Sequence, residues 1–323
     1  MQKKKILITG VAGFIGFALA EKLIKKNFIV YGIDNFDNYY SVKLKKKRIE
    51  LLKKYNNFYF KKINFTKKNN IKLFFKGKKF ETVVHLGAQA GVRYSLTNPD
   101  KYIDTNFIGF INIIENSIKN NIKKFIFASS SSVYGEQKNF PIKENIYLDP
   151  KNIYARTKKL NEEIAFDIHR LNKIDITGLR LFTVYGEWGR PDMFIMKFLK
   201  CLYNKEKLKL FNKGNHYRDF TYIDDVVEII SKLIIKKQNK KFKIFNICSN
   251  KPIHLRKLIN IMVKQTKKIP NILLTNFQKA DVLKTHGDNK KIKRYLKYYK
   301  FTKIEEGIKK TITWYKDNEI WKY

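Results

Sequence analysis

The sequence has two cysteines, few acidic residues and no long hydrophobic run. Cys201 and Cys248 are too few for a metal cluster or a disulfide framework, and nothing in the sequence supports a single bridge between them. We therefore expect a reducing compartment, the cytoplasm. No apolar run reaches the roughly 18 residues of a membrane span, and the first predicted strand begins by Lys5, which leaves no room for a signal peptide. We expect a soluble protein that does not insert into membranes.

The chain has 68 basic and 28 acidic residues, which gives it a formal net charge of +40. Lysine supplies most of it, since nine of the 68 basic residues are arginine. Such a charge would suit a nucleic-acid or anionic-membrane partner. The lysines occur in short scattered runs, however, which favours solvated side chains and no specific nucleic-acid partner. The richest run, Lys43 to Arg48, is predicted to lie on a surface helix.

The order of predicted elements indicates an α/β fold. Strand-like runs lie near residues 7, 30, 59, 84, 127 and 179, and segments with helical spacing cover 13–26, 102–119 and 152–172. This alternation predicts a Rossmann-type, doubly wound parallel sheet with right-handed crossovers. The rhythm loosens after about residue 182. We therefore predict a Rossmann-type domain over residues 1–182 and a smaller mixed α/β domain over 183–323, partly interleaved with the sheet.

A glycine-rich segment follows the first strand and opens a helix. Gly10, Gly13 and Gly16 have the spacing G-x-x-G-x-x-G, which gives a tight turn, close approach of the backbone to a pyrophosphate and an anion at a helix N-terminus. Alone this signal is weak, because any strand-to-helix turn uses glycine. Asp34 ends the second strand about 20 residues beyond the loop, where a carboxylate binds adenosine ribose hydroxyls and repels a 2′-phosphate. This favours NAD over NADP; a carboxylate that only caps a turn is the alternative.

Tyr154 and Lys158 are four residues apart and share one face of a predicted helix. A phenol with a pKa of about 10 is a poor base at neutral pH. A nearby lysine cation and the positive nicotinamide ring would lower that pKa by stabilising the phenolate. Tyr154 could then take a hydroxyl proton as hydride leaves the same carbon, with Ser130, in the loop after the fifth strand, bound to that oxygen. The same spacing occurs in any amphipathic helix, so the prediction depends on the glycine loop and the serine run as well.

Longer motifs extend over almost the whole chain: TGVAGFIG, DNFDNYYSVKLKKKR, AQAGVRYSL, SSSSVYG, YARTKKLNE, TVYGEWGRPDM, YRDFTYIDD and ADVLKT. They resemble the extended short-chain dehydrogenase/reductase family, that is, the NAD-dependent epimerase/dehydratase family, and within it most closely the UDP-glucuronate 4-epimerases. AQAGVRYSL and TVYGEWGRPDM are the most specific of these motifs. The resemblance implies tightly held NAD+, transient oxidation at C4 of a UDP-sugar, rotation of the 4-keto intermediate and return of hydride to the opposite face.

The resemblance also implies roles for individual residues. Ser130, Tyr154 and Lys158 would be catalytic, although the run from Ser129 to Ser132 leaves the serine register open. The cofactor-binding residues would be Gly10, Gly13, Phe14, Ile15, Gly16, Asp34, Asn35, Asn64, Gln89, Asn106, Tyr154 and Lys158, with Asn64 where relatives have an aspartate on adenine. The substrate-binding residues would be Arg93, Ser131, Ser132, Thr183, Arg190, Arg218 and Asp281, and no metal is expected. Arg218 would bind the diphosphate through its fork, whereas Arg93 and Arg190 suit either an anion or loop carbonyls.

Ser131 and Ser132 bear on the type of reaction. Sugar 4,6-dehydratases resemble this chain but carry an Asp-Glu pair at these positions, because elimination of water needs an acid and a base. Hydroxyls cannot do that, but they can hydrogen-bond the C6 carboxylate of a uronate, and Thr183 offers one more. A 4-keto uronate loses CO2 when its carboxylate bond aligns with the carbonyl π system. We therefore predict that these hydroxyls hold the carboxylate near the carbonyl plane.

Two other functions stay open. A 4-epimerase of UDP-glucose or a UDP-N-acetylhexosamine would share the catalytic residues and lack affinity for uronates. A non-catalytic NAD-sensing protein with a nucleic-acid partner would lack the tyrosine or the lysine, and both are present. The resemblance further implies a homodimer joined through a four-helix bundle of the helices at 102–119 and 152–172, and a place in polysaccharide biosynthesis.

Overall fold

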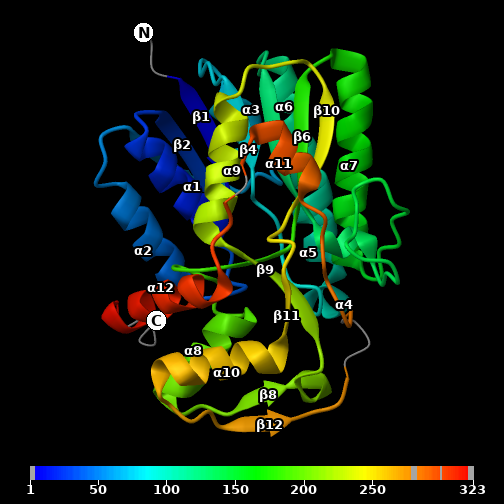
Figure 1. Cartoon of the computed structure of the whole chain (residues 1–323). Helices are drawn as coiled ribbons and strands as arrows, with labels where there is room; N and C mark the ends of the chain where they lie inside the picture. Colours follow the sequence, from blue (N-terminus) through cyan, green and yellow to red (C-terminus); the bar gives the residue numbers. More distant parts are fainter. Residues whose placement is uncertain (1–3, 278–281, 299, 319–323) are drawn as a thin grey trace.

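The computed structural model describes residues 4–277, 282–298 and 300–318. At its centre is a seven-stranded sheet with the strand order β10-β6-β5-β4-β1-β2-β3, in which every pairing is parallel (Figure 1). The strands are β1 (Lys5–Thr9), β2 (Ile29–Asp34), β3 (Phe58–Lys62), β4 (Thr82–His85), β5 (Lys124–Ser130), β6 (Asp175–Leu181) and β10 (Phe242–Ile247). The order reverses between β1 and β4, where such sheets open a crevice at the carboxyl ends of their strands. The predicted Rossmann-type fold is confirmed.

Helices cover both faces of the sheet. Alternate strand residues point to opposite sides, and apolar strand residues on both sides must be buried. Ile6 and Ile8 of β1 belong to one hydrophobic core and Leu7 to the other. The first core is covered by α1 (Phe14–Lys25), α2 (Val42–Leu52), α9 (Ile223–Ile235) and α11 (Lys290–Leu296). The second is covered by α3 (Lys68–Phe75), α6 (Gly109–Lys119) and α7 (Ile153–Asn172). Both faces are therefore buried, as the near-continuous apolar strands require.

The segment predicted as one helix over 102–119 is not a continuous α-helix. It begins with α5 (Pro99–Tyr102), continues as a π-helical turn, η1 (Ile103–Ile108), and becomes α-helical at α6. The wider turn directs Asn106 inward, where its Oδ1 accepts from the Gln89 N–H at 2.7 Å and its Nδ2 donates to the Gln89 carbonyl at 3.0 Å. Such π turns are frequent at functional sites. Here it braces the loop that follows β4.

The second half of the chain adds two small sheets and returns to the large one. The elements are β7 (Thr183–Tyr185), α8 (Phe194–Asn204), β8 (Leu208–Leu210), β9 (Tyr217–Tyr222), β11 (Pro252–His254), α10 (Leu255–Thr266), β12 (Ile272–Leu274) and α12 (Ile304–Asp317). β9 pairs with β7 and β11, and β8 with β12. Figure 1 shows α8, α10, β8 and β12 together below the large sheet. Since β10 and α9 join that sheet, the two halves interleave; the division at residue 182 stays a prediction.

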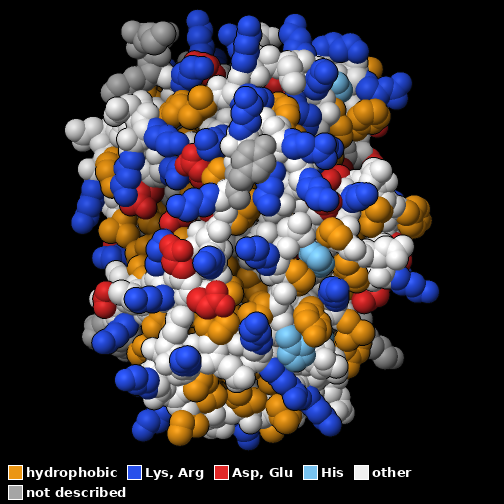
Figure 2. Space-filling model, in the orientation of Figure 1, with side chains coloured by type: hydrophobic (Ala, Val, Ile, Leu, Met, Phe, Trp, Pro, Cys, Tyr) orange, Lys and Arg blue, Asp and Glu red, His pale blue; other side chains and the backbone are white. Residues whose placement is uncertain are grey.

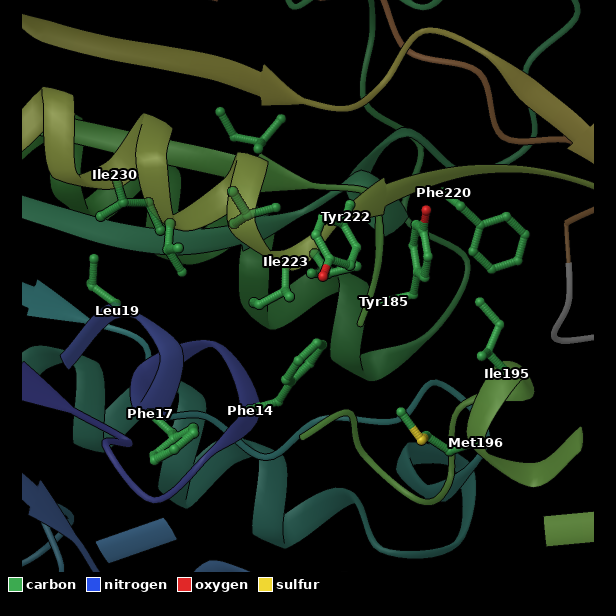
Figure 3. Close-up of a cluster of buried hydrophobic side chains, with 14 of the residues drawn as sticks. Phe14, Phe17, Leu19, Tyr185, Ile195, Met196, Phe220, Tyr222, Ile223 and Ile230 are labelled. Carbon is green, nitrogen blue, oxygen red and sulfur yellow. The ribbon is translucent and has the colours of Figure 1, made fainter. Parts of the chain in front are cut away.

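A single hydrophobic cluster joins the two halves of the chain (Figure 3). Phe14 and Phe17 of α1 lie in it together with Ile223 of α9, Tyr185 of β7 and Met196 of α8. Each large side chain buried in this way stabilises the fold by about 1.5–3 kcal/mol. α1, which begins within the glycine loop, therefore shares one hydrophobic core with elements of the second half of the chain.

The prediction of a surface helix for Lys43 to Arg48 is correct for only part of that run. Ser41 caps α2 by accepting from the Leu44 N–H at 3.2 Å, and Lys43 and Lys46 are exposed. Lys45 and Arg48, in contrast, are buried, with Arg48 0% exposed. Elsewhere basic side chains are spread over the visible face of the molecule with few acidic ones between them (Figure 2).

No helix within the described ranges is both long and apolar enough to cross a membrane. The same part of the chain has no group of three or more histidine, cysteine or acidic side chains that could hold a metal ion. Both thiols are buried and unbridged.

His85 makes the stability of the fold sensitive to acid. It ends β4, is 2% exposed, and has its Nδ1 2.7 Å from the Thr9 hydroxyl. Burial, helped by the Lys158 charge, lowers the His85 pKa from 6.5 to about 3. Because the folded pKa lies below the unfolded one, the stability that neutral His85 contributes is complete above pH 6.5 and is lost as pH falls toward 3. We expect this residue to account for about 2 kcal/mol of stability lost between pH 7 and pH 5.

Urea unfolding of the wild type and His85→Gln at both pH values measures this contribution. His85→Gln should lose about 2 kcal/mol less than the wild type on acidification. The matched variant His254→Gln, at a half-buried position, should lose as much as the wild type. Equal losses in the wild type and His85→Gln would contradict the assignment.

Candidate functional site

A cavity of about 1340 Å³ lies at the carboxyl ends of the strands, between the sheet and the second half of the chain. Its size exceeds that of a usual single-ligand pocket, so it suits a dinucleotide together with a second nucleotide. The predicted residues that line it are Gly10, Gly13, Phe14, Ile15, Gly16, Asp34, Asn35, Gln89, Arg93, Ser130, Ser131, Ser132, Tyr154, Lys158, Thr183, Arg190 and Arg218. Asn64 and Asn106 are not in the lining, and Asp281 lies outside the described residues.

The two asparagines outside the lining act on backbone. Asn64 accepts from the Thr66 N–H at 3.0 Å and so closes a local turn. Asn106 lies behind the Gln89 loop and also donates to the Thr157 hydroxyl at 3.2 Å. Neither side chain lines the cavity, so each would act on the cofactor through the loop that it supports.

The glycine loop is folded tightly on itself and against the loop after β4. Gly10 has φ +69°, and a Cβ there would lie 2.6 Å from the Cα of Gly87. A Cβ at Gly16 would lie 2.2 Å from the Gly10 carbonyl oxygen. α1 begins at Phe14 with no side-chain cap and no acidic residue in its first turn. The first N–H groups of the helix therefore suit an anion, and the cradle fits a pyrophosphate.

Asp34 both fixes this loop and faces the cavity. Its carboxylate accepts from the Ala12 N–H at 3.1 Å and the Phe36 N–H at 2.8 Å. Burial raises the Asp34 pKa, while those N–H groups and the Lys45 ammonium act in the opposite direction. The turn-cap alternative and the cofactor prediction are thus compatible: the side chain closes a turn and still lines the cavity.

Tyr154, Lys158 and Ser130 come together from α7 and β5. The Asn152 side chain caps α7 by accepting from the Ala155 N–H at 2.9 Å, which fixes the first turn that carries Tyr154. Lys158 donates from Nζ to the Ala128 carbonyl at 2.9 Å. Burial raises the Tyr154 pKa, whereas a hydrogen bond with Ser130 and the Arg190 charge lower it. Burial also lowers the Lys158 pKa to about 8, against the attraction of Glu162.

The serine register follows from the different partners of neighbouring serines. Ser130 is the last residue of β5, not a loop residue, and its side chain faces Tyr154. Its Oγ also accepts from the Ser132 N–H at 3.1 Å. Ser129 donates instead to Glu162. This geometry favours Ser130 over Ser129 as the partner of the tyrosine.

A buried ion pair lies beneath these residues. Arg180 of β6 donates to Glu162 of α7 from NH2 at 2.7 Å and from Nε at 3.0 Å. It also donates from NH1 to the Tyr134 hydroxyl and to the Glu144 carbonyl, both at 2.9 Å. Glu162 is one helical turn beyond Lys158, so the pair sets the charge next to the lysine. The motif YARTKKLNE contains Glu162, but no spacing rule relates this helix residue to Arg180 on β6.

The predicted substrate arginines are each held in place at the cavity wall. Arg190 makes a fork with Asp192, at 3.0 Å from Nε and 2.6 Å from NH2. Arg218 donates from NH1 to the carbonyls of Tyr217 at 2.9 Å and Leu283 at 3.1 Å. Anchored guanidinium groups that line a cavity are suited to bind phosphate or carboxylate without further ordering.

Arg93 is positioned by an aromatic ring. Its guanidinium carbon lies 4.0 Å from the ring centre of Phe211, which brings the loop after β4 to the turn after β8. This contact across the cavity was not predictable, because Phe211 has no motif around it.

The cavity lining also contains lysines to which the sequence motifs assigned no role: Lys45, Lys151, Lys197, Lys200, Lys207, Lys209 and Lys284. Lysines in a lysine-rich chain carry no positional signal, so only the fold reveals which of them gather. The acidic residues in the lining are fewer: Asp34, Asp37, Asp192 and Glu206. The cavity is therefore strongly cationic and suited to ligands with several negative charges.

Comparisons with known proteins agree with this site. The model of the NAD dependent epimerase/dehydratase family matches residues 6–248. A UDP-glucuronate 4-epimerase of Thermodesulfobacterium geofontis is 40% identical over 97% of this chain and 96% of its own. The structure of a UDP-glucuronic acid 4-epimerase from Bacillus cereus, in complex with UDP-glucuronic acid and NAD, is similar with a TM-score of 0.92 and 29% identity, over 97% of this chain and 99% of that one. A UDP-glucose 4-epimerase from Thermotoga maritima with UDP-glucose has a TM-score of 0.89 and 29% identity, over 98% and 99%.

Proposed function

The chain belongs to the NAD dependent epimerase/dehydratase family, and from this premise we propose that it interconverts UDP-glucuronate and UDP-galacturonate by epimerisation at C4. The observation that carries the proposal is that one cavity is lined by the glycine loop, by Tyr154, Lys158 and Ser130, and by the hydroxyl-bearing residues Ser131 and Thr183. The similarity to UDP-glucuronate 4-epimerases over nearly the full length supports it.

NAD+, when bound, supplies the oxidant for C4 and returns the hydride within the same turnover. The residues that would hold it are the glycine loop, Asp34, Asn35 and the braced Gln89 loop. Because the Gly10 and Gly16 positions admit no side chain, the backbone can approach the pyrophosphate closely. The carboxylate of Asp34, which lines the cavity, would bind the adenosine ribose hydroxyls and disfavour a 2′-phosphate, so we expect NAD and not NADP.

Tyr154 moves the proton of the reaction. It takes the proton from the C4 hydroxyl as that carbon is oxidised, and returns it after the 4-keto sugar has turned its other face. Ser130 hydrogen-bonds the same oxygen. The Ser130 hydrogen bond and the Arg190 charge favour the phenolate, and the Lys158 cation on the same helix face would add to this effect. Arginines at the wall hold the diphosphate while the sugar turns, so the intermediate stays in the cavity.

The direct test needs no added cofactor. The purified protein is incubated with UDP-glucuronate and, in parallel, with UDP-glucose, and proton NMR follows the products. UDP-galacturonate from the first substrate alone supports the proposal, and conversion of UDP-glucose alone contradicts it. The latter outcome is the second candidate function, which the similarity to the Thermotoga maritima enzyme favours. Nothing in the comparisons favours the non-catalytic alternative.

Loss of one hydroxyl should weaken selectivity for the uronate. A hydrogen bond to a charged group contributes about 1.5–3 kcal/mol, so Thr183→Ala or Ser131→Ala should lower kcat/KM for UDP-glucuronate roughly 10- to 100-fold. A carboxylate held less firmly should also release more CO2, which a pentose product would reveal. The control Ser117→Ala removes a buried hydroxyl that bonds the Ile113 carbonyl of its own helix, and should change neither. An unchanged kcat/KM and product ratio in Thr183→Ala and Ser131→Ala would refute the assignment.

We also propose a homodimer that works in the cytoplasm and supplies UDP-galacturonate for polysaccharide. Exposed apolar side chains on η1 and α7, among them Ile103, Ile108, Leu160 and Phe166, suit the packing of two helices against their copies. Light scattering after size exclusion should give twice the chain mass; a monomer would contradict the dimer.

Loss of galacturonate from surface polysaccharide on deletion of the gene would support the pathway.

A further inference from the structure

Arg48 lies at a junction of three loops of the cavity, although it does not line the cavity itself. It is 0% exposed on α2, and it is the largest fully buried side chain among the described residues. Within the described part of the chain its Nε has no partner, whereas its NH1 and NH2 groups donate to three oxygens from three different segments. Burying a cation costs free energy, and hydrogen bonds to the buried guanidinium offset part of that cost.

The first contact is with the cofactor loop. NH1 donates to the Ala12 carbonyl at 2.8 Å, and the Ala12 N–H is in turn bound by Asp34 at 3.1 Å. Both backbone polar groups of Ala12 are therefore hydrogen-bonded, the N–H to a carboxylate and the carbonyl to a guanidinium. A displacement of Arg48 would move the backbone that cradles the pyrophosphate.

The second contact is with the loop between β7 and α8, on the substrate side. NH2 donates to the carbonyl of Trp188, a residue in the left-handed region at φ +58°. The Trp188 ring packs edge-on against Phe17 of α1, with centroids 5.3 Å apart. Two residues further along, Arg190 and its partner Asp192 enter the cavity wall.

The third contact closes the junction. NH1 also donates to the hydroxyl of Tyr40 at 2.9 Å. The adjacent Tyr39 donates to Asp192 at 3.2 Å, so this loop reaches the substrate-side wall as well. The planar fork serves three acceptors at fixed angles, which a lysine ammonium cannot reproduce.

We propose that Arg48 is a positioning residue that couples the cofactor loop to the substrate-side loop. Through this coupling, binding of the nucleotide part of the substrate slows the release of NAD, and binding of NAD slows the release of the nucleotide. The inference rests on the proposed function for the identity of the two ligands. Coupling between two sites is reciprocal and amounts to about 5- to 150-fold in typical proteins. We therefore expect UDP to slow the release of NAD from the wild-type protein by about fivefold or more.

Release of NAD from the purified holoenzyme, with and without UDP, tests the coupling. Arg48→Lys keeps the charge but loses the fork, so UDP should change its NAD release by less than about twofold. The control Lys46→Met lies on the same helix at an exposed position and should behave as the wild type. A general loss of stability would speed release equally in both conditions and leave the UDP effect intact, and that result would overturn the proposal.

A second measurement needs no variant, in case Arg48→Lys does not fold. UDP added to the wild-type holoenzyme should slow amide hydrogen exchange at residues 10–16 as well as at 186–192. Protection of 186–192 alone would overturn the coupling. Epimerase activity and extracted NAD are measured on the same preparation, so failure of the proposed function is recognised separately from failure of this inference.

Discussion

Replacement of Tyr154 by phenylalanine should lower kcat about 10²- to 10⁴-fold while the protein keeps its cofactor and its affinity for UDP-glucuronate. The variant loses one oxygen, and with it the group that exchanges a proton with the C4 hydroxyl. The ring should stay in place, since it packs edge-on against Tyr102 with centroids 6.1 Å apart. The loss should therefore appear in kcat and not in binding.

Single-turnover kinetics and calorimetric titration with UDP-glucuronate separate the two quantities. The control Tyr31→Phe changes a tyrosine that stacks on Tyr59, outside the cavity lining, and should leave kcat unchanged. A Tyr154→Phe protein that retains more than about a tenth of wild-type kcat would mean that another group transfers the proton.

The features that the sequence predicted are local in the chain. The parallel strands follow from short apolar runs, and the glycine loop follows from three residues that must lack a side chain. Tyr154 and Lys158 are related by one helical turn, so their common orientation needs no knowledge of the fold. The sequence also narrowed the catalytic serine to four consecutive residues, and the structure pairs Ser130 with Tyr154 and Ser129 with Glu162.

The features that escaped prediction depend on residues far apart in sequence. Arg48 was placed on a surface helix because its neighbours are lysines, and only the packing of three loops shows why it is buried. The π turn at Asn106 has the apolar spacing of an α-helix and is distinguished by its bond to Gln89. Charge and spacing rules describe a helix in isolation and cannot identify such contacts.

The ion pair beneath the site should have the largest effect on stability. Arg180→Met leaves the Glu162 carboxylate buried at 6% exposure without its partner, and loss of one member of a buried pair costs about 3–5 kcal/mol. The double variant Arg180→Met/Glu162→Leu removes both charges and should recover most of this stability, because well-packed apolar residues often replace a buried pair without loss. Urea unfolding of the wild type, both single variants and the double variant completes the thermodynamic cycle.

Activity should not recover with stability in the double variant. Glu162 raises the pKa of Lys158, which burial holds at about 8, so its removal lowers that pKa further and leaves less lysine cation at neutral pH. The alkaline limb of the kcat profile should therefore move to lower pH, as the remaining cation loses its proton earlier. A pair that serves stability alone would restore the wild-type profile in the double variant. A stable double variant with an unshifted profile would thus remove Glu162 from the chemistry and leave it a purely structural anchor of α7.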